Sequence, residues 1–101
     1  MLVIAGTVSI DPEKREAAVA AALEMMRETL KEAGCISYTF SGDLSDPGGF
    51  RIFEEWESQD ALDAHFKAPH MAKFQAEMGG FGVRGMDVKR YEVASVGPIG
   101  G

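Results

Sequence analysis

The hydrophobic positions at the start of the chain change from a strand pattern to a helix pattern. Residues 2–10 are apolar on both alternating sets of positions, as in a strand covered on both faces. Asp11 can cap a helix that begins at the following proline, and the helical pattern continues to Ala33, after which Gly34 ends it. We expect one apolar stripe of this helix to face the core, formed by Val19, Leu23, Met26, Leu30 and Ala33.

Two further segments with alternating patterns, residues 35–42 and 50–57, follow the helix. The Asp-Pro-Gly-Gly sequence between them is a turn signal, so together they predict a hairpin with a rather long loop. Ser58 can cap the next helix, which Pro69 interrupts, and a second helical piece restarts there. A glycine-rich connection then leads to a last strand over residues 86–96.

The order of elements, β-α-β-β-α-β, predicts an α+β protein with a ferredoxin-like fold. We expect one domain over residues 1–96 and a flexible C-terminal tail over residues 97–101. Helices then cover one face of the sheet only. Because the first strand is apolar on both faces, we predict a homodimer that packs sheet against sheet.

Charge and composition narrow the partners and the compartment. The formal net charge of −6 argues against nucleic acid or an anionic membrane as a partner. No apolar run approaches the ~20 residues that span a bilayer, and the first residues do not resemble a signal peptide. The one cysteine, Cys35, cannot form an internal disulfide, so we expect a cytoplasmic protein. Cys35 follows a helix end, where the helix dipole raises the pKa of a thiol, and we expect it to be structural.

Both histidines, His65 and His70, lie in one short segment on either side of Pro69. On an uninterrupted helix, five residues turn by about 140°, so the two side chains would diverge. The chain also has no CxxC or HExxH motif, and we therefore expect no metal site. His65 shares a face with apolar residues and could be a core residue, whereas His70 could accept a proton as a general base.

Aromatic and sulfur-containing side chains are predicted to gather opposite these histidines. Tyr38, Glu54 and Trp56 would face the helices if their strand faces point inward. Such a cavity suits a flat aromatic ligand, although plain core packing explains the same residues. The further residues expected to bind the ligand are Phe40, Phe66, Phe74 and Met78.

A family pattern runs through residues 34–74, GCISYTFSGDLSDPGGFRIFEEWESQDALDAHFKAPHMAKF. It resembles the antibiotic biosynthesis monooxygenase family, which includes quinol monooxygenases. The positions that carry the resemblance are Gly34, Cys35, Tyr38, Asp46, Pro47, Phe53, Glu54, Trp56, Ser58, His65, Pro69 and His70.

This resemblance implies a dimeric α/β barrel of ferredoxin-like subunits. It also implies an oxygenase without metal, flavin or nicotinamide, in which a quinol or anthrone is deprotonated and its anion reacts directly with molecular oxygen. By the same resemblance, Trp56 and Tyr38 would line the ring and His65 or His70 would take the proton. Glu54 would orient a partner or be a paired buried carboxylate.

Other functions on the same fold remain open at this point. The chain could be a non-catalytic, dimeric ligand-binding or stress-related protein, or an isomerase that needs no oxygen. Haem-degrading relatives need a histidine late in the second helix and an asparagine in the first strand. Here Gln75 and Ala76 stand where that histidine would fall, and the chain contains no asparagine, so haem degradation is not expected.

Overall fold

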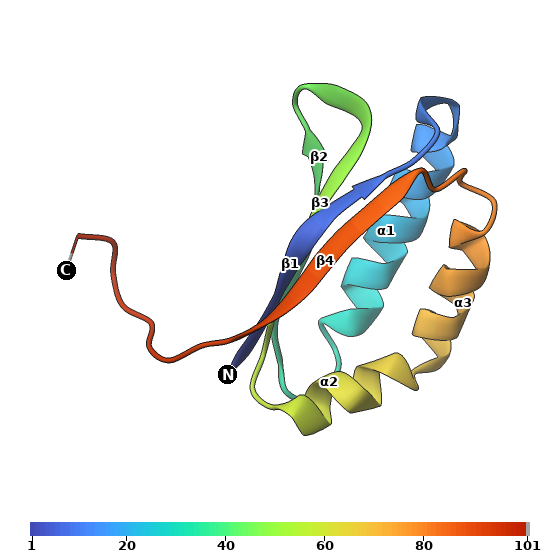
Figure 1. The fold of residues 1–101 in the computed structure, drawn as a ribbon. Helices are drawn as coiled ribbons and strands as arrows, with labels where there is room; N and C mark the ends of the chain where they lie inside the picture. The colour runs from blue at the N-terminus through green and yellow to red at the C-terminus, as the bar shows by residue number, and fades with distance from the viewer. Residues whose placement is uncertain (101) are drawn as a thin grey trace.

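The computed structural model, which describes residues 1–100, has a layer of strands and a layer of helices (Figure 1). The sheet has four strands in the order β2-β3-β1-β4, and each neighbouring pair is antiparallel. The helices lie on one face of the sheet and leave the other face open. This arrangement confirms the predicted α+β, ferredoxin-like fold. The strands are β1 (Leu2–Ser9), β2 (Cys35–Asp43), β3 (Asp46–Trp56) and β4 (Gly85–Glu92), and the helices are α1 (Arg15–Thr29), α2 (Gln59–Phe66) and α3 (Pro69–Met78).

The predicted helix starts are largely confirmed. Asp11 accepts a hydrogen bond from the backbone N–H of Glu13 at 3.0 Å, although the turn that follows is a 3₁₀ turn and α1 itself begins at Arg15. Ser58 Oγ accepts from the backbone N–H of Ala61 at 3.2 Å and caps α2. Pro69 ends one helical segment and opens α3, as predicted.

The expected apolar stripe of α1 is only partly right: Val19 and Met26 pack against the core, but the leucines of the stripe do not, and the helix ends earlier than Ala33. Leu23 and Leu30 are 49% and 52% exposed. The face that packs on the sheet is offset from the stripe and consists of Ala18, Ala21, Ala22, Met25 and Thr29. Short alanine side chains let the helix approach the sheet closely, whereas leucine at those positions would hold the two layers apart.

The prediction of a long hairpin loop is also wrong, because only Leu44 and Ser45 separate the strands β2 and β3. The Asp-Pro-Gly-Gly sequence belongs to β3, where the register is irregular next to Asp43. This irregular segment brings the Gly48 carbonyl to the backbone N–H of Ile10 at 2.8 Å. The turn residues therefore form a bulged strand end rather than a loop.

The last strand ends at Glu92 instead of residue 96, and residues 93–100 extend away from the sheet without helix or strand (Figure 1). The predicted tail, residues 97–101, includes Gly101, which lies outside the described residues. Within residues 1–100, none of the helices combines the length and the apolar character needed to cross a bilayer.

Gly6 sets how closely β4 approaches β1. It pairs with Val88, and a Cβ atom at Gly6 would lie 2.6 Å from Val88 Cα and still closer to the carbonyl oxygen of Asp87. A side chain at this position therefore forces the two strands apart.

We expect Gly6→Ala to lower the free energy of unfolding by about 2 kcal/mol, the usual cost of overpacking. Urea denaturation measures the change. The matched control is Gly85→Ala, because a Cβ atom there meets nothing within 4 Å. Equal stability of the two variants would contradict the close approach.

Candidate functional site

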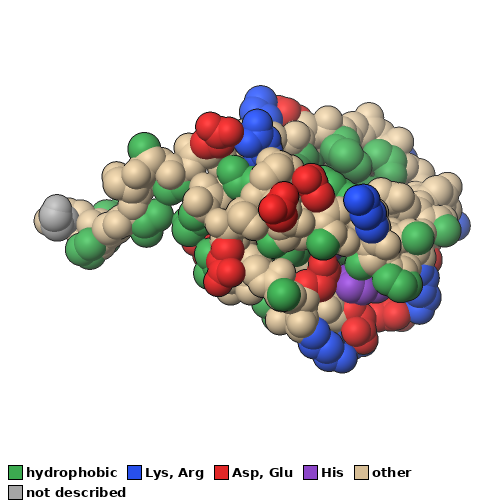
Figure 2. Space-filling view, turned by 90° about the horizontal axis from the view of Figure 1, so that it is seen from below, with side chains coloured by type: hydrophobic (Ala, Val, Ile, Leu, Met, Phe, Trp, Pro, Cys, Tyr) green, Lys and Arg blue, Asp and Glu red, His purple; other side chains and the backbone are tan. Residues whose placement is uncertain are grey.

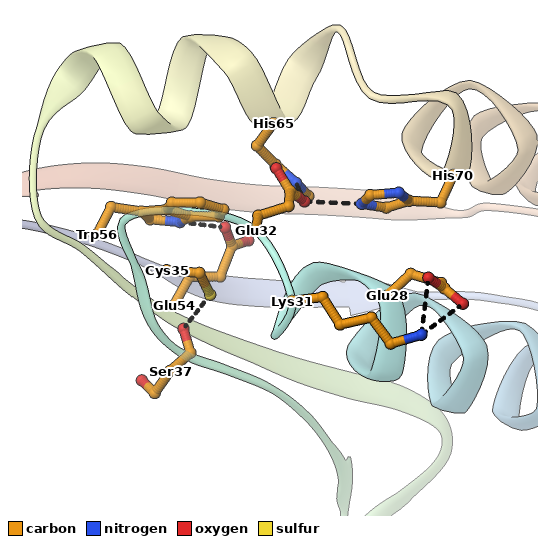
Figure 3. Close-up of polar contacts among 9 residues, drawn as sticks. All are labelled: Glu28, Lys31, Glu32, Cys35, Ser37, Glu54, Trp56, His65 and His70. Atoms are coloured by element: carbon orange, nitrogen blue, oxygen red, sulfur yellow. Dashed lines mark hydrogen bonds and ion pairs between the residues drawn. The ribbon is translucent and has the colours of Figure 1, made fainter.

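Glu54 and Trp56 lie two residues apart on β3 and point toward the helices, since alternate residues of a strand share a face. Glu54 is 5% exposed and Trp56 is fully buried. Trp56 Nε1 donates a hydrogen bond to Glu54 Oε1 at 2.9 Å (Figure 3). The register places Glu54 between Ile4 on β1 and Tyr38 on β2. The carboxyl group is thus held near the middle of the covered face of the sheet.

Burial changes the proton affinity of this carboxyl group. It raises the pKa of Glu54 to about 7, the hydrogen bond from Trp56 opposes this rise, and the Glu32 carboxylate adds to it. At neutral pH, Glu54 is therefore present in both its protonated and its ionised form. A group in this state can accept a proton or return one.

Tyr38 remains a phenol beside Glu54. Burial, reinforced by the carboxylates of Glu54 and Glu32, raises the pKa of Tyr38 far above its usual value. Its ring meets that of Phe40 nearly at right angles, with 5.6 Å between the centroids. The hydroxyl group can therefore donate a hydrogen bond to an anion but does not become one itself.

Cys35 lies next to this group and is not a nucleophile. Burial raises the pKa of Cys35 to about 11, with smaller contributions from Glu32 and Glu54, so the thiol stays protonated at neutral pH. The predicted direction is confirmed, although burial is the main cause rather than a helix dipole.

A cavity of about 230 Å³ lies between the sheet and α3. Its polar lining residues are Tyr38, Glu54 and Gln75, and the rest of the lining is apolar. A second cavity of about 40 Å³ shares Phe40, Phe74 and Met78 with it. The volume is below the ~300–1,000 Å³ of sites for drug-sized ligands and fits a compact ring system.

Six of the predicted site residues line this cavity: Tyr38, Phe40, Glu54, Phe66, Phe74 and Met78. Trp56 stands behind Glu54 rather than in the lining. The prediction missed Met86 and Val88, which the sheet order brings to the cavity from β4, although β4 showed only a general strand pattern in the sequence.

The two histidines lie together, outside the lining of this cavity. His65 Nδ1 and His70 Nε2 are each 2.7 Å from the same oxygen, Glu32 Oε2 (Figure 3). The expectation that their side chains diverge is wrong, because Pro69 separates α2 from α3 and the chain changes direction between them. Glu32 was missed, since it lies in the connection between α1 and β2 and belongs to no recognisable motif.

The His65 ring packs against the wall of aromatic side chains. Its centroid is 4.8 Å from that of Trp56 and 5.4 Å from that of Tyr38. Its Nε2 atom is buried and has no hydrogen-bond partner among the described residues. His65 thus lies behind the residues of the cavity, and His70 is the more exposed of the two imidazoles.

Comparison with known proteins shows the family to which the chain belongs. The family model described as antibiotic biosynthesis monooxygenase matches residues 1–77. The chain belongs to this family. The resemblance seen in residues 34–74 is therefore confirmed over a longer segment, which includes β1 and α1.

Two proteins similar to this chain come from a cyanobacterium and a mycobacterium. The chain is 31% identical over 93 residues to the uncharacterized protein sll1783 of Synechocystis, which covers 92% of this chain and 63% of that protein. It is 35% identical over 68 residues to "Putative monooxygenase Rv0793" of Mycobacterium tuberculosis, covering 67% of this chain and 66% of that protein. The chain thus spans slightly less than two thirds of the length of each of these two relatives.

A solved structure from Deinococcus radiodurans, described as a "putative antibiotic biosynthesis monooxygenase", superposes with a TM-score of 0.91. Its sequence is 28% identical, and the match covers 100% of both chains.

The raised pKa of Glu54 makes the stability of the protein depend on pH. The pKa of Glu54 is about 7 in the folded protein and 4.5 as the ordinary value, so the folded state binds the proton more tightly than the unfolded state. The tighter proton binding by Glu54 stabilises the folded state fully below pH 4.5, and this stabilisation is lost as the pH rises to about 7. At ~1.4 kcal/mol per pKa unit, the loss amounts to roughly 3 kcal/mol.

Glu54→Gln keeps the size and the acceptor oxygen but cannot ionise. We expect this variant to be more stable than the wild type by about 3 kcal/mol at pH 8, with the difference shrinking toward pH 4.5. Urea denaturation of both proteins across this pH range measures it. A difference that stays constant with pH would show that Glu54 has no raised pKa.

Proposed function

We propose that this protein is a cofactor-independent monooxygenase that oxidises a quinol-like or anthrone-like aromatic compound with molecular oxygen. The observation that carries the proposal is a buried carboxyl group with a pKa of about 7, Glu54, in the wall of an apolar cavity of ring size. Membership of the monooxygenase family supports it.

Glu54 acts as the general base in this proposal. Its Oε1 atom is held by Trp56, which leaves Oε2 free to take the proton of a bound substrate. The removal of this proton makes the ring an electron-rich anion, which reduces oxygen directly. For an anthrone, one oxygen atom becomes a carbonyl at the CH₂ carbon, and the other leaves as water with the two hydrogens of that carbon.

Tyr38 stabilises the anion that forms. Because its phenol stays protonated, its hydroxyl group can donate a hydrogen bond to the charge that develops on the substrate oxygen. The apolar lining strengthens this interaction, since electrostatic interactions are stronger where water is excluded. The flat faces of Phe40 and Phe74, which lie 5.6 Å apart between centroids, limit the space beside the ring.

This assignment differs from the expectation that His65 or His70 takes the proton. Both imidazoles contact Glu32 and neither lines the cavity, whereas Glu54 lies in its wall. We therefore assign the proton transfer to Glu54 and give the histidines no direct contact with the substrate.

The first test is oxygen uptake by chelator-treated protein with naphthohydroquinones and anthrones. We expect uptake above the spontaneous rate and a kcat/KM that rises with pH through about 7, because the ionised form of Glu54 is the active one. Glu54→Gln should lower kcat/KM by about 100-fold or more. Trp56→Phe removes a contact that lowers the pKa of Glu54 and should move this pH profile upward.

His70→Ala and Glu57→Gln are the matched controls, since neither residue lines the cavity, and both variants should keep most of the activity. Full activity of Glu54→Gln together with loss in His70→Ala would assign the base to the histidine instead. Tight binding of the compounds without oxygen uptake would favour a ligand-binding or stress-related protein. Conversion of the compounds under nitrogen would indicate an isomerase.

We also propose that two copies pack through the open face of the sheet to form a dimeric α/β barrel. Phe53 and Tyr91 are 47% and 50% exposed on the strands that flank β1. The register places Phe53 beside Ala5 and Tyr91 beside Val3, so an apolar strip crosses three strands. Contact with a second copy would remove this strip from water.

Sedimentation velocity at micromolar concentration tests this interface. We expect a dimer for the wild type and a monomer for Phe53→Glu, which buries a charge in the contact. Leu23→Glu changes an equally exposed residue, 49%, on the helical layer and should leave the dimer intact. A monomeric wild type, or equal effects of both variants, would contradict sheet-to-sheet packing.

A further inference from the structure

Glu32, His65 and His70 form a compact group of donor atoms, here named the Glu-His-His cluster. The three residues come from three segments: the connection between α1 and β2, helix α2, and the first turn of α3. Glu32 Oε2, His65 Nδ1 and His70 Nε2 all lie within 4.8 Å of one another. None of them lines the cavity that contains Glu54, so the cluster is separate from the proposed reaction site.

The donor atoms of the cluster are those that bind a divalent transition metal. Two imidazole nitrogens and one carboxylate oxygen are the usual ligands of Zn²⁺ and of similar first-row ions. Ligand atoms bound at ~2.1 Å around a tetrahedral ion are ~3.4 Å apart, which follows from the same coordination geometry. The two histidine contacts with Glu32 Oε2 are 2.7 Å, and all three donor atoms lie within 4.8 Å of one another, so the present spacings bracket this value.

The charge of the cluster also favours a cation. The side chain of Glu32 is only 15% exposed, and among residues 1–100 no lysine or arginine forms an ion pair with it. Within the described part of the chain, the partly buried carboxylate contacts only the imidazoles of His65 and His70, neither of which is a permanent positive charge. A divalent ion between the three donor atoms would supply this positive charge.

Solvent can reach the cluster from one side. The side chain of His65 is 1% exposed and that of His70 is 20% exposed. Figure 2 shows histidine atoms at the surface beside acidic side chains. An ion can therefore enter past His70 and keep water as a fourth ligand. On the inner side, the ring of Trp56 holds His65 in place.

We propose that the Glu-His-His cluster binds one divalent transition-metal ion, with Zn²⁺ as the reference ion. The ion joins the α1–β2 connection, α2 and α3, and thereby stabilises the packing of these three segments. Its role is structural, because none of its three ligands lines the cavity that contains Glu54. The expectation of no metal site rested on the missing CxxC and HExxH motifs and on histidines that would diverge on an uninterrupted helix, and the second premise does not hold in the structure.

The test uses full-length protein stripped of metal and titrated with Co²⁺ and then with Zn²⁺. We expect the visible absorption bands of four-coordinate Co²⁺ at one ion per chain, displacement of Co²⁺ by Zn²⁺, and a Tm that rises with Zn²⁺ concentration. His70→Ala and Glu32→Gln should weaken the Co²⁺ affinity at least 100-fold and remove the effect of Zn²⁺ on Tm.

Glu28→Gln is the control, since Glu28 is a nearby exposed carboxylate that pairs with Lys31 at 3.3 Å and is not part of the cluster. It should bind Co²⁺ as the wild type does. Circular dichroism of His70→Ala without metal shows whether that variant is folded, and Glu32→Gln is an independent second variant.

Absence of Co²⁺ bands and of a Zn²⁺-dependent Tm in the wild type would overturn the proposal. Binding that survives in both His70→Ala and Glu32→Gln would place the ion elsewhere and overturn it equally. Oxygen uptake by the chelated protein is a separate measurement, so failure of the proposed oxygenase activity leaves the metal site unaffected, and the reverse also holds.

Discussion

The buried carboxyl group of Glu54 constrains the rest of the structure. A carboxylate in an apolar cavity is costly unless a donor satisfies it, and Trp56 provides one N–H from the same strand. Because the two residues are separated by one position on β3, both must face the helices, and a large indole must then be accommodated beneath α2. The ring of His65 packs on the indole, and the ring of Tyr38 packs on that of His65. The buried carboxyl group of Glu54 thus needs the indole of Trp56 as a donor, and the indole needs the surrounding rings to pack against.

The fold was predictable because its signals are local. Asp11, Ser58 and Pro69 mark helix starts through backbone geometry that depends on few neighbours, and the structure has all three at helix starts. The packed face of α1 was not predictable in this way. Large apolar residues were expected to be buried, yet alanines face the sheet, because the distance between the layers is set by the whole assembly of strands and helices.

In the candidate site, too, residues marked by local sequence patterns could be predicted, whereas contacts between distant segments could not. Glu54 and Tyr38 were found because strand alternation and a family pattern pointed to them, and Phe74 because it lies on the apolar face of the last helical segment; the structure brings all three to one cavity. Glu32 was not found, because its link to the histidines spans 33 residues and depends on how Pro69 redirects the chain. Such a contact has no spacing rule in the sequence. The function of the group it forms is visible only once the three segments have been placed.

Because Pro69 begins a new helix, the cavity is built from two independent elements, the sheet and α3. The residues that would handle protons, Glu54 and Tyr38, are carried by the sheet, whereas Phe74 and Met78 on α3 set the length and width of the space above them. The break lets α3 shift or change its side chains without disturbing the register of the strands. In the proposed oxygenase, α3 is therefore the helix to redesign when a different ring system is to be accepted.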